Sequence, residues 1–360
     1  MKYAITADLH LRADNADRLA YCDALCTLVQ SQDIGNLIVA GDLFDQGYSG
    51  YKALDALLVR HSGLQVTVLP GNHDPDLAQG QFSSINIRVV TRPEVLAGDK
   101  GETGLVLLPY REGCTMGEAL TEAKLETKKT GAWVLVSHGD FGTTARDLNG
   151  NESGYFPLTR RDITRYAFKR VILGHIHKPS SLDDEVLVPG SPWPIDSSER
   201  GPRRVLVLET LDGSVTSLGL GFSPCWLDWT IHLLPDGNEP ARIKEALDHN
   251  FLHWERSQAD GGQTGPVHVR VSVRGCTSRR SEPDRIVQQW FAGTPLQLAE
   301  CTSDDLWFVE TDSSLKLLTA EFEQALAELK LDPRQFPGDH NEMLDMIREY
   351  GLSYIYGLEE

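Results

Sequence analysis

The stretch Val171-Ile172-Leu173-Gly174-His175-Ile176-His177-Lys178-Pro179 decides the fold class, because an apolar run of strand character stops at a glycine and then delivers two histidines. Side chains at positions i and i+2 of an extended segment point the same way and lie about 6.5 Å apart. That separation suits one imidazole on each of two metal ions held about 3.5–4 Å apart. A lone pair of this kind is more often made of ordinary surface or core histidines, so its meaning depends on the rest of the chain.

Four further stretches share the pattern of an apolar run that ends in Asp, His or Asn. They are Ala7-Asp8-Leu9-His10, Gly41-Asp42-Leu43-Phe44-Asp45, Gly71-Asn72-His73-Asp74 and Ser137-His138-Gly139-Asp140. Any one of them could be a turn with polar residues. Five together, each after a predicted strand, favour a common site.

The sequence around these motifs predicts alternating strands and helices. Strands are expected at 2–7, 36–40 and 66–69, and amphipathic helices at 14–30 and 51–61. Such alternation predicts a sheet with helices on both faces, whose working groups collect beyond the carboxyl ends of the strands. Later elements are expected at 87–90, 105–109, 115–128 (a helix), 133–136, 186–188, 204–208 and 215–218, with a loop over the site at 140–157.

A second α/β unit is predicted beyond residue 222. Its expected elements are strands at 225–233, 266–273, 296–299 and 306–310 and helices at 240–255 and 282–291, followed by two helices at 314–330 and 341–350. We therefore expect three parts, with residues 1–220 as the first domain, 222–312 as a smaller α/β domain and 313–360 as a helical segment.

Composition is that of a soluble globular protein, with 41% hydrophobic and 24% charged residues among 360. No stretch approaches 18 consecutive apolar residues, and residues 1–7 run straight into a strand, so we expect a cytoplasmic protein without membrane association. The six cysteines are scattered without a Cys-X-X-Cys pair, which argues against a disulfide framework or a thiolate zinc site.

Charge is unevenly distributed along the chain. The formal net charge of −18 argues against unspecific nucleic-acid binding by bulk attraction. Residues 300–360 carry a net charge of −11, whereas residues 158–204 carry +3. Phosphate contacts would therefore be local, and their candidates are Arg160, Arg161, Arg165 and Lys178. The bland alternative is a solvated helix face.

The side chains in the five motifs are suited to a two-metal site. Asp8 and His10 share the i,i+2 relation, and Asp42 carries two oxygens that can bridge two ions. Asn72 offers an amide oxygen, and His138, His175 and His177 offer imidazole nitrogens. A donor set of this kind without thiolate suits Mn²⁺, Fe²⁺ or Zn²⁺ better than Mg²⁺ or Ca²⁺, and we favour Mn²⁺.

A general acid is expected beside these ligands. Two dications polarise a phosphoryl oxygen and supply an activated water, and the leaving oxygen then needs a proton. His73 lies next to a ligand in sequence and can protonate that oxygen. Asp74 is expected to orient His73.

The motifs D-L-H, G-D-L-F-D, G-N-H-D, S-H-G-D and G-H-I-H-K-P resemble those of the calcineurin-like metallophosphoesterase superfamily over residues 1 to about 220. The resemblance implies a four-layer αββα sandwich. It also implies that Asp8, His10, Asp42 and His177 hold the first metal and that Asp42, Asn72, His138 and His175 hold the second. His73 would be the catalytic acid, with Asp74 steadying it.

Within this superfamily the chain is most similar to the SbcD/Mre-eleven DNA-repair nucleases. The similarity rests on G-D-L-F-D, G-H-I-H-K-P, Pro189-Gly190-Ser191-Pro192, Asp196 and Glu199. It implies that the second unit is a capping domain and that the last helices dock on an SMC-like ATPase of the SbcC type. The helix at 51–59 could supply a homodimer face or be buried within the monomer.

The chain also departs from that family. Leu11-Arg12 stand where the family usually has a glycine, the capping region is compact and the C-terminal segment is strongly acidic. The leading expectation is a Mn²⁺-dependent DNA exonuclease and endonuclease in DNA repair. The alternatives are a phosphodiesterase or phosphatase acting on nucleotides or other small phosphoesters, and a non-catalytic scaffold that binds DNA ends or an ATPase.

Overall fold

The computed structural model describes residues 1–12, 15–45, 50–98, 101–124, 132–142, 154–182, 185–235, 237–257, 262–278, 282–310, 313–330 and 340–356. The chain divides into two compact units. The first contains Met1–Cys225 and Gly261–Gly265, and the second contains Trp226–Asp260 and Pro266–Glu360. Each unit is described by itself.

The first sheet of the first unit is built around β1, an apolar strand. Its strand order is β12-β11-β1-β2-β3-β4. The bounds are β1 Lys2–Thr6, β2 Asn36–Ala40, β3 Gln65–Leu69, β4 Ile87–Val89, β11 Arg204–Glu209 and β12 Ser214–Gly219. Strands β1 to β4 are parallel, whereas β11 pairs antiparallel with both β1 and β12.

The second sheet has the strand order β5-β6-β7-β8-β10-β9. The bounds are β5 Glu94–Leu96, β6 Gly104–Leu108, β7 Trp133–His138, β8 Phe168–Gly174, β9 Ser180–Ser181 and β10 Val186–Val188. Its central strands β6, β7, β8 and β10 are parallel. The sequence analysis did not predict β5 or β9, which are only three and two residues long and have too few apolar residues to show a period.

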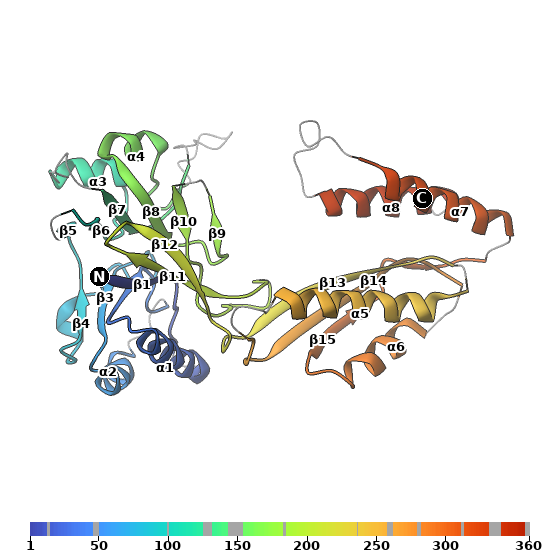
Figure 1. Ribbon diagram of the computed structural model, residues 1–360, viewed down its shortest axis with the longest axis horizontal. Helices are drawn as coiled ribbons and strands as arrows, with labels where there is room; N and C mark the ends of the chain where they lie inside the picture. The colour runs from blue at the N-terminus through green and yellow to red at the C-terminus, as the bar shows by residue number, and fades with distance from the viewer. Residues whose placement is uncertain are drawn as a thin grey trace. The chain divides into compact units, whose positions relative to one another are not determined.

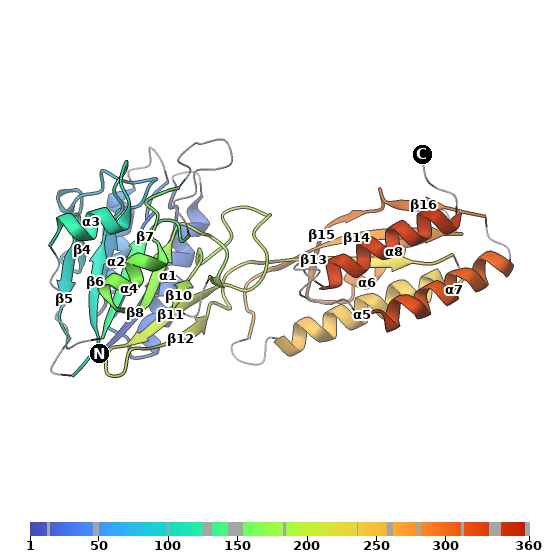
Figure 2. The ribbon, with the colours of Figure 1, turned by 90° about the horizontal axis from the view of Figure 1, so that it is seen from above.

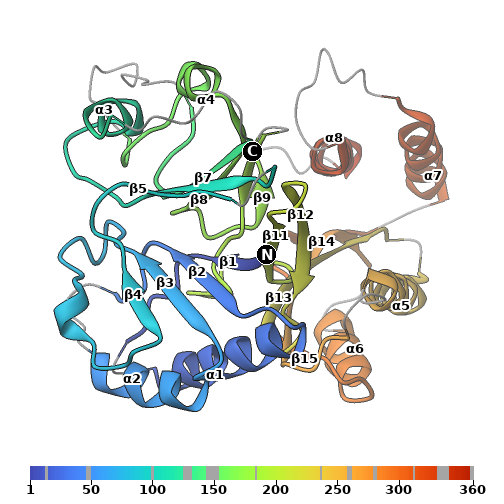
Figure 3. The ribbon, with the colours of Figure 1, turned by 60° about the vertical axis from the view of Figure 1, so that its left-hand side comes forward.

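Four layers result from the packing of these sheets, as Figure 3 shows. Helices α1 (Ala16–Ser31) and α2 (Tyr51–Arg60) cover the outer face of the first sheet, and α3 (Met116–Glu122) and α4 (Arg160–Tyr166) cover that of the second. An apolar cluster that includes Ile5, Ile38, Val134 and Ile172 lies between the sheets. The mixed α/β fold with helices on both sides agrees with the sandwich expected from the sequence.

Some predicted elements end elsewhere in the structure. The helix expected at 115–128 ends at Glu122, and Lys124 adopts a positive φ of 47°, which breaks a right-handed helix. Residues 125–131, and 143–153 of the loop expected over the site, lie outside the described residues. In α2, Leu54, Leu57 and Leu58 are buried within the first unit, the alternative to a dimer face.

The second unit is a four-stranded sheet with four helices. Its strands are β13 Cys225–Leu233, β14 Val267–Thr277, β15 Gln297–Thr302 and β16 Leu306–Phe308, and β14 pairs with both β15 and β16. Helices α5 (Glu239–Ser257) and α6 (Glu282–Phe291) pack on each other along the sheet (Figure 1).

Helices α7 (Ser313–Glu328) and α8 (His340–Tyr356) form a second pair in the same compact unit (Figure 2). Arg348 of α8 donates to the carboxylate of Glu323 in α7 at 3.0 Å. Leu352 of α8 is fully buried in a small cluster that contains Cys276 of β14. Among the described residues no helix combines the length and apolar character that crossing a membrane requires.

Candidate metal centre

The candidate site lies where parallel strands of both sheets end. The five motifs follow β1, β2 and β3 in the first sheet and β7 and β8 in the second. Four of the motif residues have left-handed backbones, namely Asp8 (φ 56°), His10 (φ 43°), Asp42 (φ 51°) and His175 (φ 96°). For residues with a side chain this conformation costs about 1–3 kcal/mol each, and such strain clusters at functional sites.

Two glycines let the motifs come together. Gly41 has a φ of 94°, and a Cβ there would lie 2.0 Å from Nδ1 of His138. A Cβ on Gly71 would lie 2.1 Å from Oδ1 of Asp42. Because a carbon atom cannot approach so closely, only glycine leaves room for these two side chains.

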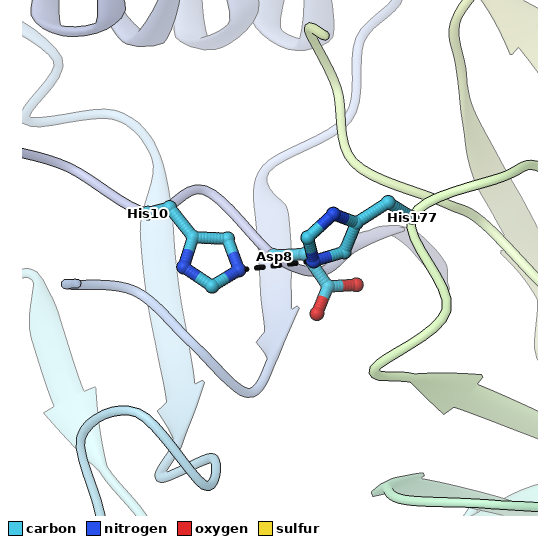
Figure 4. Close-up of side chains that lie close together, drawn as sticks. All are labelled: Asp8, His10 and His177. Atoms are coloured by element: carbon cyan, nitrogen blue, oxygen red, sulfur yellow. Dashed lines mark hydrogen bonds between the residues drawn. The ribbon is translucent and has the colours of Figure 1, made fainter. Parts of the chain in front are cut away.

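The first group of donors contains Asp8, His10 and His177. Figure 4 shows the two imidazoles pointing at one another above the carboxylate. Their Nε2 atoms are 3.1 Å apart, and the three side chains can each offer one ligand atom to a common ion. Asp8 and His10 are almost fully buried, at 0% and 2% exposure, whereas the side chain of His177 is 31% exposed.

The second group contains Asp42, Asn72, His138 and His175. Oδ1 of Asn72 lies 2.8 Å from Nε2 of His138 and 3.0 Å from Nδ1 of His175. Asp42, His138 and His175 also have ligand atoms close enough to hold one ion. His175 and His177, which follow the end of β8 at Gly174, fall in different groups, as the sequence led us to expect.

Asp42 lies between the two groups. Its Oδ2 is 3.6 Å from Nε2 of His10 and 3.4 Å from Nε2 of His138. Its Oδ1 accepts a hydrogen bond from the backbone N–H of His73 at 2.9 Å. One carboxylate thus faces both groups and also holds the loop that carries His73.

Burial and mutual charge shift the pKa values of these side chains. Burial raises the pKa of Asp8 to about 6 and lowers that of His10 to about 4. Burial alone would raise the pKa of Asp42, but the hydrogen bond and charge of His138, the backbone N–H of His73 and the charge of His10 together hold the pKa below its ordinary value. Burial alone would lower the pKa of His138, but the hydrogen bond and charge of Asp42 raise it to about 9. The centre of the site therefore favours positive charge beside Asp42.

The donor set fits a pair of divalent cations. Nδ1 of His138 lies 2.9 Å from the carbonyl oxygen of Ala40, which can only accept, so Nδ1 carries the hydrogen. The lone pair of Nε2 then faces the oxygens of Asn72 and Asp42, and only a proton or a cation can lie favourably between them. With carboxylate, amide and imidazole donors, these residues suit borderline divalent ions.

His73 is held by a carboxylate to which the sequence analysis gave no role. Nδ1 of His73 lies 2.9 Å from Oδ1 of Asp45, the last residue of the G-D-L-F-D motif. The expected partner, Asp74, instead accepts hydrogen bonds from the backbone N–H groups of Gly71 at 2.8 Å and Phe44 at 3.1 Å. Asp74 therefore braces two loops, and Asp45 orients the imidazole.

Buried side chains from other segments hold the loop that follows β1 in place. The indole N–H of Trp193 donates to the carbonyl oxygen of Leu9 at 3.1 Å. Arg18 of α1 donates to the carbonyl oxygens of both His10 and Ile195. Because a single guanidinium joins residues so far apart in sequence, the position of His10 depends on the segment beyond β10.

The second group has an open side. Oδ1 of Asp140 lies 3.6 Å from Nε2 of His175, and the ring of Tyr155 lies 4.8 Å from the His175 ring. Tyr155 is 53% exposed, and its backbone N–H donates to Asp140 at 2.8 Å. Asp140 ends the S-H-G-D motif and Tyr155 lies in the loop expected over the site at 140–157, but neither was given a role from the sequence.

Three of the four predicted phosphate contacts lie on α4, and the fourth directly follows His177. Arg160, Arg161 and Arg165 are exposed on α4 and line an open pocket of about 940 Å³ between α3 and α4. Phe141 and the acidic residues Glu118, Glu122 and Asp162 line the same pocket. Phe141 directly follows Asp140, so this pocket adjoins the open side of the second group. Lys178 is exposed next to His177.

Residues 1–179 match the family model described as calcineurin-like phosphoesterase. No protein with a curated description matches the chain.

Several solved structures resemble part of the chain. A novel archaeal phosphodiesterase is 12% identical, with a TM-score of 0.34, over 61% of this chain and 99% of its own. A dimetal phosphatase from Danio rerio is 12% identical, with a TM-score of 0.38, over 61% and 96%. The nuclease MPE from Pseudomonas putida is 18% identical, with a TM-score of 0.29, over 60% and 87%. Similarities at this level carry no information about the substrate of this chain.

Proposed function

The part of the chain from residue 1 to residue 179 belongs to the calcineurin-like phosphoesterase family, and from this premise we propose that the protein is a two-metal phosphodiesterase that cleaves DNA. The family is dinuclear, and the candidate ligand groups of this chain agree with that requirement. The observation that carries the proposal is the position of Asp42, whose Oδ2 faces His10 on one side and His138 on the other.

The chemistry assigns a role to each part of the site. A pair of bound dications would polarise the phosphoryl oxygens and activate a water molecule. Asp8, His10 and His177 would hold one ion, Asn72, His138 and His175 the other, and Asp42 both.

His73 serves as the acid for the leaving oxygen. Because Asp45 accepts the Nδ1 hydrogen, Nε2 of His73 is the nitrogen left to donate a proton outward. The His73 side chain is 35% exposed, whereas that of His10 is 3% exposed. Of these neighbouring imidazoles, His73 is thus the one that a substrate can reach.

DNA is proposed as the substrate because of the arginine-lined pocket beside the site. Arg161 and Arg165 project from α4 into the same open pocket, which adjoins Asp140 through Phe141. Arginine side chains bind phosphate oxygens bidentately, and a nucleic-acid backbone offers several phosphates in a row. A small phosphoester has no second phosphate to reach this pocket while its reacting phosphate lies at the metal centre.

Mn²⁺ is proposed as the working ion. The donor set mixes carboxylate, amide and imidazole without sulfur, and Mn²⁺ accepts both oxygen and nitrogen ligands. Fe²⁺ and Zn²⁺ share this tolerance and are the alternatives.

A nuclease assay on DNA labelled at either end tests the function. Wild type with Mn²⁺ is expected to cleave, whereas Asp42→Ala is expected to be inactive and His73→Ala to lose about 10²–10⁴-fold in rate. Lys52→Glu, an exposed change on α2, serves as the control. Activity on a small phosphodiester with none on single- or double-stranded DNA would refute the nuclease and support the small-substrate alternative.

A partner is proposed for the last helix pair. Met346, Tyr350 and Tyr354 recur at every fourth position of α8 and are 68%, 70% and 73% exposed. Large apolar side chains in a row on a helix mark an interaction face. We propose that this face docks on an SMC-like ATPase of the SbcC type.

Co-purification with such an ATPase from the same organism tests the docking. The variant Tyr350→Ser/Tyr354→Ser should lose the complex while keeping nuclease activity. Leu318→Ser, another exposed apolar change on α7, is the matched control. Undiminished binding by the double variant would refute this surface.

A further inference from the structure

Glu199 is a largely buried carboxylate that contacts His177 of the first donor group. Its Oε1 lies 2.7 Å from Nδ1 of His177. Its Oε2 accepts hydrogen bonds from the Ser191 hydroxyl at 3.0 Å and from the backbone N–H of Ile195 at 3.2 Å. The side chain is 11% exposed, so these contacts are largely shielded from water.

Arg203 completes the arrangement from the opposite side. Its NH1 lies 3.2 Å from Oε2 of Glu199, and its side chain is fully buried. The same NH1 donates to the carbonyl oxygen of His177 at 2.9 Å, and NH2 donates to the carbonyl oxygen of Glu199 at 2.9 Å. Glu199 therefore fixes the ring of His177, while Arg203 fixes both the backbone of His177 and Glu199 itself.

The contact with Glu199 decides which nitrogen of His177 faces the site. A carboxylate can only accept, so Nδ1 of His177 carries the hydrogen and Nε2 keeps its lone pair. That lone pair points at Nε2 of His10, 3.1 Å away (Figure 4). Among the rotations of the ring, this is the one that offers His177 as a ligand.

We propose that Glu199, held by Arg203, is a positioning residue that sets the metal affinity of the Asp8, His10 and His177 group without touching an ion or the substrate. Glu199 lies beyond residues 1–179, the part that matches the family model. The inference rests on the proposed metal centre, since it concerns how firmly one of its two ions is held. Carboxylates that orient a ligating histidine typically contribute about 10–100-fold to metal affinity.

Two variants separate reach from charge at this position. Glu199→Asp keeps a negative charge near Arg203 but withdraws the carboxylate by one methylene from His177. Glu199→Gln keeps the reach but removes the charge, and its NH₂ group would face Nδ1 of His177, because the position of Oε2 accepts from Ile195 and Arg203. Asp196→Asn is the matched control, because this exposed carboxylate of the same segment bonds only to Ser198 among the contacts described.

Calorimetric titration of the metal-free full chain with Mn²⁺ measures the affinities. Asn72→Ala, which removes a donor of the other group, identifies the binding step that belongs to each site. We expect Glu199→Asp to weaken the step of the Asp8 group about 10–100-fold. Glu199→Gln should weaken it at least as much, because its amide would donate to Nδ1 of His177 and favour the wrong tautomer, and Asp196→Asn should leave it unchanged.

A spectroscopic readout reports the ring itself. In metal-free protein with ¹⁵N-labelled histidine, wild-type His177 is expected to show its hydrogen on Nδ1. Glu199→Asp is expected to move part of the population to the Nε2–H form. A variant that merely loosened the fold would shift many histidine signals together, so this selective change identifies positioning.

The outcomes of the titration distinguish a failure of the role proposed for Glu199 from a failure of the proposed metal centre. If wild type binds two Mn²⁺ and Glu199→Asp binds both with unchanged affinity, Glu199 has no positioning role and the metal centre stands. Unchanged affinity in Glu199→Gln would also overturn the inference, because an acceptor opposite Nδ1 of His177 would then not matter. If wild type binds no Mn²⁺, both the proposed metal centre and the role of Glu199 are refuted.

Discussion

Nδ1 of His73 lies 2.9 Å from Oδ1 of Asp45, although the two residues come from motifs that are 28 positions apart. This contact fixes the orientation of the partly exposed His73 imidazole, so that Nε2 is directed away from Asp45. Oδ2 of Asp45 lies 3.3 Å from NH1 of Arg12, so one carboxylate oxygen contacts Arg12 and the other contacts His73. The proposed acid thus depends on a residue outside the ligand set.

Replacing Asp45 with Asn should slow the cleavage of substrates that have poor leaving groups. The amide can donate to Nδ1 and stabilise the wrong tautomer of His73, so we expect a rate loss of about 10²–10⁴-fold on an alkyl phosphodiester or DNA. On p-nitrophenyl phosphodiesters, whose leaving group needs no proton, the loss should be small. Steady-state rates on both substrates check this, and equal losses on the two would contradict the role.

Replacing Gly71 with Ala should displace the carboxylate of Asp42. In Gly71→Ala the new Cβ would overlap Oδ1 of Asp42, which must move. A displacement of about 1 Å in a positioned group can cost about 10²-fold in rate, and the Asp42 carboxylate faces both donor groups. Gly80→Ala is the control, because its Cβ would meet nothing within 4 Å. Unchanged kcat and Mn²⁺ affinity in Gly71→Ala would show that the loop adapts without cost.

Replacing Arg203 should lower the free energy of unfolding, because the largely buried Glu199 carboxylate loses its compensating positive charge. Arg203→Met leaves the Glu199 carboxylate without its ion-pair partner, and breaking a buried pair in this way costs about 3–5 kcal/mol. The double variant Arg203→Met/Glu199→Gln should recover part of the loss, because no charge is then stranded. Thermal unfolding of the three proteins measures this, and a double variant less stable than Arg203→Met would argue against the explanation.

Binding of Mn²⁺ should stabilise the first unit. A ligand that binds only the folded state at a hundred times its Kd adds about 2.7 kcal/mol per site. For a domain of this size that corresponds to a rise in Tm of about 5–10 °C. Scanning calorimetry with Mn²⁺ and with a chelator tests it, with Asp42→Ala as the variant in which the rise should disappear. An equal rise in that variant would indicate binding elsewhere.

Reversing charge on α4 should change how DNA affinity depends on salt. Each phosphate contact contributes about 0.9 to the slope of log K against log salt, so Arg161→Glu/Arg165→Glu should flatten the slope by about 2. The comparison protein is Lys52→Glu, whose exposed charge lies on α2. Binding measured by fluorescence anisotropy at several salt concentrations decides it, and a slope equal to that of wild type would remove α4 from the DNA surface.

The sequence carried enough information for the fold class and for the strand-end motifs, and the reason is physical. The buried leucines of α2 recur with the helical period, and an apolar run such as 171–173 that stops at a glycine before a polar ligand type marks the end of a strand. Short strands such as β5 (Glu94–Leu96) have no such period.

Contacts between distant residues were the part that the sequence could not supply. Asp74 is adjacent to His73 in sequence, which made it the natural partner, yet its carboxylate is taken by the N–H groups of Gly71 and Phe44. Asp45 and Glu199 were visible in the motifs, but only the fold brings them to His73 and His177. Roles that depend on contacts between residues far apart in the sequence cannot be recognised from a local sequence motif.

The antiparallel pairing of β11 with β1 has a practical consequence for anyone who shortens the chain. A truncation at residue 179 would leave the edge of β1 bare, and an uncovered apolar strand edge promotes aggregation. The same cut would discard Trp193, Glu199 and Arg203, which support the two histidine-bearing loops. An expression fragment intended to keep the centre intact should therefore run at least to Cys225, the last residue of the longer segment of the first compact unit.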